Sequence, residues 1–236
     1  TKREVYEQVR NSQLYDSELS MYKVNEPLEK ESYELGRCRA FTPGWLENES
    51  IWLHMEYKYL LELLKSGLYQ QYIEDLHKAA IPFQDEERYG RSILENSSFL
   101  ASSANPDESI HGRGFVARLS GSTVEFMDMW QRMMFGHTPF REEDDKLVFA
   151  LQPVIPSYLL DQERRVEAVF LGKVRIVYHV DAEDADYIPG SYEVMQYCLT
   201  GEKGKEIHIY QNQIKGEKAE NIRAGKYTQI EVWLER

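Results

Sequence analysis

The spacing of the apolar residues changes near residue 140, and this change most constrains the fold. Before Pro139, apolar side chains recur at helical spacing in three stretches, at 50–65, 69–80 and 120–135. Beyond it, short runs alternate apolar and polar residues between glycines, as half-buried strands do. We therefore expect a helical half followed by a β-rich half.

The helical stretches end at recognisable stop signals. Gly67 follows the first stretch, Pro82 the second and Gly136 the third. The first stretch is apolar almost all round, which is typical of a helix buried on several sides. Because a very short connection joins it to the second, we expect an antiparallel helical hairpin. Residues 2–10 are also expected to be helical, and residues 16–36 to form a connecting segment.

The second half contains β-rich runs separated by turn residues, at 147–151, 166–171, 173–180, 192–199, 206–211 and 228–234. An antiparallel β-sandwich is the economical interpretation of such runs. We accordingly divide the chain into a linker or N-terminal extension at 1–36, a helical domain at 37–140 and a β-sandwich domain at 141–236.

Charge and cysteine content restrict the class of protein. The 28 Lys and Arg against 40 Asp and Glu give a net charge of -12, which disfavours nucleic acid and acidic membranes as partners. No run approaches the ~20 apolar residues of a membrane span, and the start at Thr1 resembles neither an initiator methionine nor a signal sequence. Cys38 and Cys198 are too few and too far apart for a disulfide framework, which favours a cytoplasmic protein. The start at Thr1 leads us to expect that the natural N-terminus is missing.

No cofactor and no metal are expected from the sequence. Acidic clusters such as 142–145 are typical of solvated loops. Four further histidines occur singly, without a second ligand at metal-binding spacing: His77, His137, His179 and His208.

The first candidate functional motif runs from Pro43-Gly44 through Glu47-Asn48 to His54. The Pro-Gly turn places Glu47 in the turn and His54 in the following helix, so their side chains can converge. A histidine can bind an anion as a donor, and a carboxylate can hold sugar hydroxyls or activate water. From spacing alone, the stronger interpretation is that His54 is simply a satisfied helix residue.

The second motif runs from His111-Gly112-Arg113-Gly114 to Leu119-Ser120-Gly121-Ser122. Helix capping explains the Ser and Gly residues adequately, because Ser favours the N-cap and Gly permits unusual backbone angles. Hydroxyls and free N–H groups at a helix start, with Arg113 upstream, can equally cradle a phosphate or a developing oxyanion.

Together the two motifs resemble glycoside hydrolase family 94, the inverting disaccharide phosphorylases that include cellobiose and chitobiose phosphorylases. In that family a P-G-x-x-E-N-G segment runs into a helix-borne histidine, and residues 43–54 keep this spacing. The family's G-R-G segment followed by T-G-[ST] resembles residues 111–122, and its proline-rich entry into a C-terminal β-domain resembles residues 146–156. The resemblance spans roughly residues 20 to 180.

The resemblance implies a fold and a set of site residues. The fold would be mainly α helical hairpins from the end of an (α/α)6 barrel, followed by an antiparallel β-sandwich. Phosphate would be bound by His54, Ser120 and Gly121. Their own chemistry makes Arg113 a further phosphate ligand, and Glu47 a candidate sugar contact or, in a water-using enzyme, a base. Carbohydrate and inorganic phosphate, the latter as co-substrate, would be the ligands, and a homodimer the expected assembly.

The chain also departs from the family. Glu49 stands where the family has the Gly of E-N-G, and Ser120 replaces Thr. The family's general acid, an aspartate in an Asp-Trp-Asn-Asp-like motif, does not occur in the 236 residues. We therefore expect a C-terminal fragment, inactive alone, that contributes the phosphate side of an inverting glycoside phosphorylase acting on β-linked di- or oligosaccharides. An inverting glycosidase of the same fold that uses water, and a non-catalytic glycan- or protein-binding module, are the alternatives.

Overall fold

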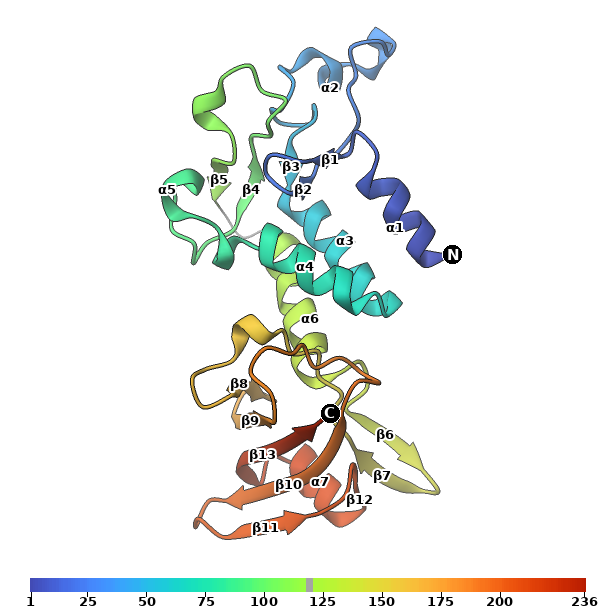
Figure 1. Ribbon diagram of the computed structural model, residues 1–236, viewed down its shortest axis with the longest axis vertical. Helices are drawn as coiled ribbons and strands as arrows, with labels where there is room; N and C mark the ends of the chain where they lie inside the picture. Colours follow the sequence, from blue (N-terminus) through green and yellow to red (C-terminus); the bar gives the residue numbers. More distant parts are fainter. Residues whose placement is uncertain (118–120) are drawn as a thin grey trace. The chain divides into compact units, whose positions relative to one another are not determined.

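The computed structural model describes residues 1–117 and 121–236 (Figure 1). The described chain forms two compact units, Thr1–Met129 and Trp130–Arg236. The α-helices are α1 (Lys2–Arg10), α2 (Arg37–Ala40), α3 (Leu53–Ser66), α4 (Tyr69–Ala79), α5 (Glu86–Tyr89), α6 (Gly121–Phe135) and α7 (Glu217–Arg223). None of the helices in the described ranges combines the length and the apolarity that a membrane span requires.

The first unit is built around α3 and α4, which pack side by side (Figure 1). Its strands are β1 (Tyr15–Asp16), β2 (Met21–Tyr22), β3 (Ile51–Trp52), β4 (Ser97–Leu100) and β5 (Gly114–Ala117). Leu60 and Leu61 of α3 and Tyr72 and Leu76 of α4 are buried in its core. The helices expected at 2–10 and 69–80 form within one residue of their expected ends.

The expected run of helical hairpins from an (α/α)6 barrel is wrong. Within the described part of 37–140, α3 and α4 form a single helical hairpin, and β3, β4 and β5 form a three-stranded antiparallel sheet. The sequence shows little sign of β4, because all four of its residues are buried and two of them, Ser97 and Ser98, are polar. Without apolar and polar alternation, such a short strand resembles a turn-rich loop.

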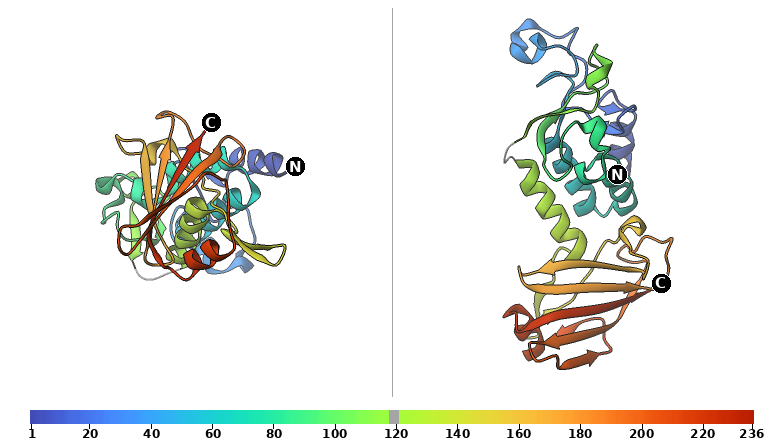
Figure 2. Two further views of the ribbon diagram at one scale, coloured as in Figure 1. Left: turned by 90° about the horizontal axis from the view of Figure 1, so that it is seen from below. Right: turned by 90° about the vertical axis from the view of Figure 1, so that its left-hand side faces the viewer.

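The second unit contains two sheets that share one apolar core. Its strands are β6 (Phe140–Glu143), β7 (Lys146–Phe149), β8 (Arg165–Phe170), β9 (Val174–Val180), β10 (Glu193–Gly201), β11 (Glu206–Ile209), β12 (Ile214–Lys215) and β13 (Tyr227–Glu235). A five-stranded sheet has the order β11-β10-β13-β9-β8, and a three-stranded sheet the order β12-β7-β6 (Figure 2). Phe149 of β7 packs on Phe170 and Tyr197, with ring centroids 5.9 and 6.1 Å apart.

The expectation of purely antiparallel sheets is also wrong. The last strand, β13, lies between β10 and β9, antiparallel to β10 and parallel to β9. The five-stranded sheet is therefore mixed. Helix α7 leads into β13 and lies against β7 and β12, in a stretch that the sequence marks only by its glycines. Local periodicity predicts that a run is a strand, but it does not predict which strands it pairs with in a sheet.

Candidate functional site

His54 lies at the N-terminus of α3, directly after the two-residue strand β3. Pairing of Ile51 with Leu100 fixes β3 against β4. The N-cap residue Trp52 makes no side-chain capping bond, and its indole Nε1 donates to the carbonyl of Leu46 at 2.7 Å. The start of α3 is thus anchored to the Pro-Gly turn, while the His54 side chain keeps 39% of its surface exposed.

The imidazole of His54 lies directly against Gly121, the first residue of α6. A Cβ atom at Gly121 would lie 2.5 Å from Nδ1 of His54 and still nearer to Cε1 and Nε2, closer than side chains can approach. A side chain at position 121 would therefore displace the imidazole, and the contact joins the two sequence motifs. The N-terminus of the 15-residue helix α6 carries partial positive charge from the helix dipole.

Glu125 of α6 is the third member of this cluster, and the sequence analysis did not find it. Its Oε1 lies 3.4 Å from Nε2 of His54, and 18% of its side-chain surface is exposed. The available signal was its position four residues after Gly121, which places both on one face of α6. The carboxylate forms an ion pair with a protonated imidazole, and it repels an anion when the imidazole is neutral.

Glu47 belongs to the turn and not to this cluster. Its Oε1 accepts a hydrogen bond from Nη2 of Arg37 at 2.7 Å, and its backbone carbonyl accepts one from Nδ2 of Asn25, also at 2.7 Å. These partners precede the Pro-Gly turn in the sequence. The expected convergence of Glu47 and His54 stays a prediction, because no contact between their side chains supports it among the described residues.

Arg113 lies at a different place in the first unit. Its guanidinium packs over Gly90 at the end of α5, where a Cβ would lie 2.9 Å from Nε. Its side chain is exposed, and its backbone carbonyl accepts a hydrogen bond from the amide of Ala101. Ser120, the other predicted phosphate ligand, lies outside the described residues.

His111, which begins the second motif, has a structural role. Its Nδ1 lies 3.0 Å from Oε1 of Glu18, and its Nε2 lies 2.8 Å from the carbonyl oxygen of Asn105. Burial alone would lower the pKa of His111, but its hydrogen bonds to Asn105 and Glu18 raise it overall. A protonated His111 therefore ties the loop before β5 to the segment after β1.

The Pro-Gly turn has a tightly constrained backbone. A Cβ on Gly44 would lie 2.5 Å from the backbone nitrogen of Asn105, so the loop before β5 excludes any side chain there. Glu49 adopts a left-handed backbone with φ of 57°. That conformation favours glycine, and Glu49 is held in it by an ion pair at 2.7 Å with Lys23.

Aromatic side chains form a wall next to the start of α3. Trp52 and Phe99 stack with centroids 5.7 Å apart, and Phe99 and Phe115 stack at 5.5 Å. Trp45 meets the edge of this pair, 4.5 Å from Phe115. Phe99 is buried, whereas the other three are partly exposed, so the cluster both fills the core of the small sheet and leaves some ring surface exposed.

A cavity of about 540 Å³ borders the Pro-Gly turn. It is lined by Gln13, Pro27, Glu29, Lys30, Glu31, Pro43, Glu49 and Ala104. Its carboxylates outnumber its single lysine, so this cavity is poorly suited to a phosphate ion.

Comparison with models of known protein families and with curated proteins finds no match to this chain.

Proposed function

We propose that this chain supplies the phosphate-binding side of a glycoside phosphorylase site, at the junction of His54 and Gly121. One observation carries the proposal: the imidazole lies in the space that the absent side chain of Gly121 leaves open, at the N-terminus of a 15-residue helix. A donor ring beside the positively polarised N-terminus of a helix is an arrangement that favours phosphate. The resemblance to the disaccharide phosphorylases names the same two residues.

The backbone of the Pro-Gly turn gives independent support. Glu49 occupies the position where the phosphorylases have glycine, and it adopts the left-handed conformation that glycine favours. A change of residue type that keeps the backbone angle is expected of a chain that retains the family's turn. Because the 236 residues contain no Asp-Trp-Asn-Asp motif, the proposal assigns phosphate binding to this chain and not the complete reaction.

Phosphate would act here as the nucleophile at the anomeric carbon. A dianion must be partly neutralised before it can approach an electron-rich sugar, and a protonated His54 with the N-terminus of α6 would do so. Glu125 would orient the imidazole through their 3.4 Å contact. The aromatic wall of Trp45, Trp52 and Phe115 would then offer ring faces to the sugar.

Phosphate titration of the purified chain by isothermal calorimetry tests the proposal. We expect His54→Ala and Gly121→Ala each to weaken phosphate binding at least tenfold, the first by removing a donor and the second by displacing the ring. Glu47→Gln is the matched control, because Glu47 pairs with Arg37, and it should leave the affinity unchanged. Equal affinity in the wild type and in His54→Ala would contradict the proposal.

A water-using inverting glycosidase is the second candidate, and the Glu125 carboxylate beside His54 is the observation that favours it. A carboxylate at that place can activate water, and it disfavours a second negative charge. The same titration separates the two. Phosphate binding by the wild type supports the phosphorylase. Phosphate binding by the Glu125→Gln variant but not by the wild type supports the glycosidase.

A further inference from the structure

The solvent side of the five-stranded sheet carries a side-chain cluster that the proposed phosphate site does not use. On the hairpin of β10 and β11, Cys198 pairs directly with His208, and Thr200 pairs with Glu206. Directly opposed residues share a face of the sheet, and residues two apart on a strand do so as well. The hairpin therefore gathers Cys198, Glu206 and His208, although each looks isolated in the sequence.

Three donor atoms converge in this cluster. The Sγ of Cys198 lies 3.9 Å from Nε2 of His208, and Oε2 of Glu206 lies 3.6 Å from the same nitrogen. All three donor atoms lie within 4.8 Å of one another. Around a tetrahedral zinc ion with ordinary bond lengths, sulfur and nitrogen are about 3.6 Å apart and nitrogen and oxygen about 3.4 Å apart. Small rotations of the exposed side chains of Glu206 and His208 bring the donor atoms to these separations.

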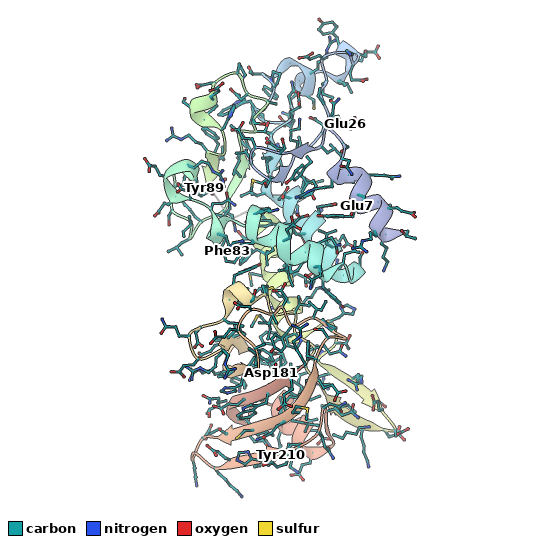
Figure 3. The ribbon with its side chains drawn as sticks, in the orientation of Figure 1. Glu7, Glu26, Phe83, Tyr89, Asp181 and Tyr210 are labelled. Atoms are coloured by element: carbon teal, nitrogen blue, oxygen red, sulfur yellow. The ribbon has the colours of Figure 1, made fainter. Side chains whose placement is uncertain are left out.

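The arrangement is not that of a nucleophile and its base. In such a relay the histidine faces the nucleophile with one ring nitrogen and the carboxylate with the other. Here Cys198 and Glu206 both face Nε2, while the Gln196 amide lies 2.9 Å from Nδ1. Tyr210, labelled in Figure 3, stacks on the imidazole with centroids 6.4 Å apart. Gln196 and Tyr210 both orient the His208 imidazole, and the three donor atoms face one common point.

We propose that Cys198, Glu206 and His208 form a zinc site, with water as the fourth ligand. A thiolate, an imidazole nitrogen and a carboxylate oxygen are donors that zinc accepts in tetrahedral sites. Binding replaces the thiol proton by the metal ion, and that proton passes to solvent. A half turn of the Gln196 amide makes its oxygen the acceptor of the Nδ1 proton, which leaves Nε2 free for the metal.

The surroundings of the cluster are suited to a cation. Glu231 lies opposite Cys198 on β13, the strand on the other side of β10 from His208. Its carboxylate interacts electrostatically with the Cys198 thiol, and it adds negative charge beside the three ligands. Cys198 itself is only 3% exposed, so the sheet holds the sulfur in a fixed position.

Cobalt(II) titration of the reduced full chain tests the site, because cobalt replaces zinc and reports thiolate ligation by its absorption. We expect one equivalent of cobalt to produce a near-ultraviolet thiolate-to-cobalt band and visible bands of tetrahedral intensity. One equivalent of zinc should abolish both. Cys198→Ser should remove the near-ultraviolet band, and His208→Gln and Glu206→Gln should each weaken cobalt binding at least tenfold.

Cys38→Ser is the matched control, because it removes the other cysteine and should leave the spectrum unchanged. Gln196→Leu should weaken binding by about tenfold while keeping the thiolate band, as expected for a residue that orients a ligand. Circular dichroism establishes that each variant is folded. A thiolate band that persists in Cys198→Ser, that disappears in Cys38→Ser, or that never forms in the wild type would overturn the proposal. His54→Ala should not affect it, so this test is separate from that of phosphate binding.

Discussion

Glu56 is a carboxyl group that the fold of the first unit keeps away from water. It is 1% exposed, and its Oε2 accepts a hydrogen bond from the backbone amide of Tyr22 at 2.9 Å. Its Oε1 has no hydrogen-bond partner among the described residues. Burial raises the pKa of Glu56 to about 8, against the opposing effect of the Tyr22 hydrogen bond and with an added contribution from Asp75. The folded protein thus holds a proton here at neutral pH.

This proton makes the stability of the fold dependent on pH. Between about pH 4.5 and about pH 8 the folded state keeps the Glu56 proton and the unfolded state loses it, so the free energy of unfolding falls as pH rises. Glu56→Gln removes this titration. As pH rises through that window, the free energy of unfolding of the variant should therefore increase relative to that of the wild type, by at most about 1.4 kcal/mol per pH unit. Urea unfolding at several pH values measures this difference.

Glu62→Gln is the control for that measurement, since Glu62 lies on the same helix and is 64% exposed. Its free energy of unfolding should stay parallel to that of the wild type at every pH. A difference between Glu56→Gln and the wild type that does not change with pH would show that Glu56 is ionised in the folded state.

At the scale of elements, α1 is held in the first unit by a buried ion pair. Nη1 of Arg10 lies 2.9 Å from Oδ1 of Asp75 on α4, and the hydroxyl of Tyr22 on β2 donates to Oδ2 of Asp75 at 2.8 Å. The Asp75 side chain is fully buried, and burial raises its pKa despite these partners. Three elements therefore depend on one carboxylate, which needs its cation.

Removal of that cation should detach α1. Arg10→Ala leaves a buried carboxylate without its partner, and we expect it to lower the free energy of unfolding by about 3–5 kcal/mol. Asp75→Asn in the same background should recover part of the loss, because it removes the buried charge. Arg3→Ala, an exposed position on α1, is the control. Urea unfolding checks all three, and a loss in Arg10→Ala no larger than in Arg3→Ala would contradict the role of the pair.

The elements that the sequence predicted well are those with a clear period. α1 and α4 and the strand runs of the second unit carry their apolar residues at helical or alternating spacing. The elements that it missed are short or carry polar residues inside, as in β4 with Ser97 and Ser98. The parallel pairing of β13 with β9 was missed for another reason, because pairing partners are chosen by the whole sheet.

The residues of the candidate sites also differ in how far the sequence could predict them. The proximity of His54 and Gly121 followed from the resemblance, and spacing alone left it open. Glu125 was missed because a single carboxylate on a helix has no signature of its own. The cluster of Cys198 and His208 was missed because only the β10–β11 register brings the two together.

At the scale of the whole molecule, the chain has two separate cores. Leu60 is fully buried in the first unit, and Ile230 of β13 is fully buried in the second. Each unit therefore contains enough apolar burial to unfold as a cooperative unit of its own.

Substitutions in the two cores should act on different unfolding transitions. Leu60→Ala and Ile230→Ala each create a cavity that costs about 2–5 kcal/mol in the unit concerned. Differential scanning calorimetry should show two transitions, of which the first variant lowers one and the second variant lowers the other. A single transition that both variants shift equally would show that the units unfold together.

The turn between β10 and β11 has a consequence for how this protein can vary in evolution. Residues 202–205 are exposed, so substitutions at 202, 203 and 205 cost the fold little, whereas Gly204 has a φ of 71° that favours glycine. The loss or gain of one residue there is different, because it would turn every side chain of β11 to the opposite face. Ile207 and Ile209 would then face water, and His208 would face the core. In related sequences the residues of this turn other than Gly204 should vary freely, while selection holds the length of the turn constant.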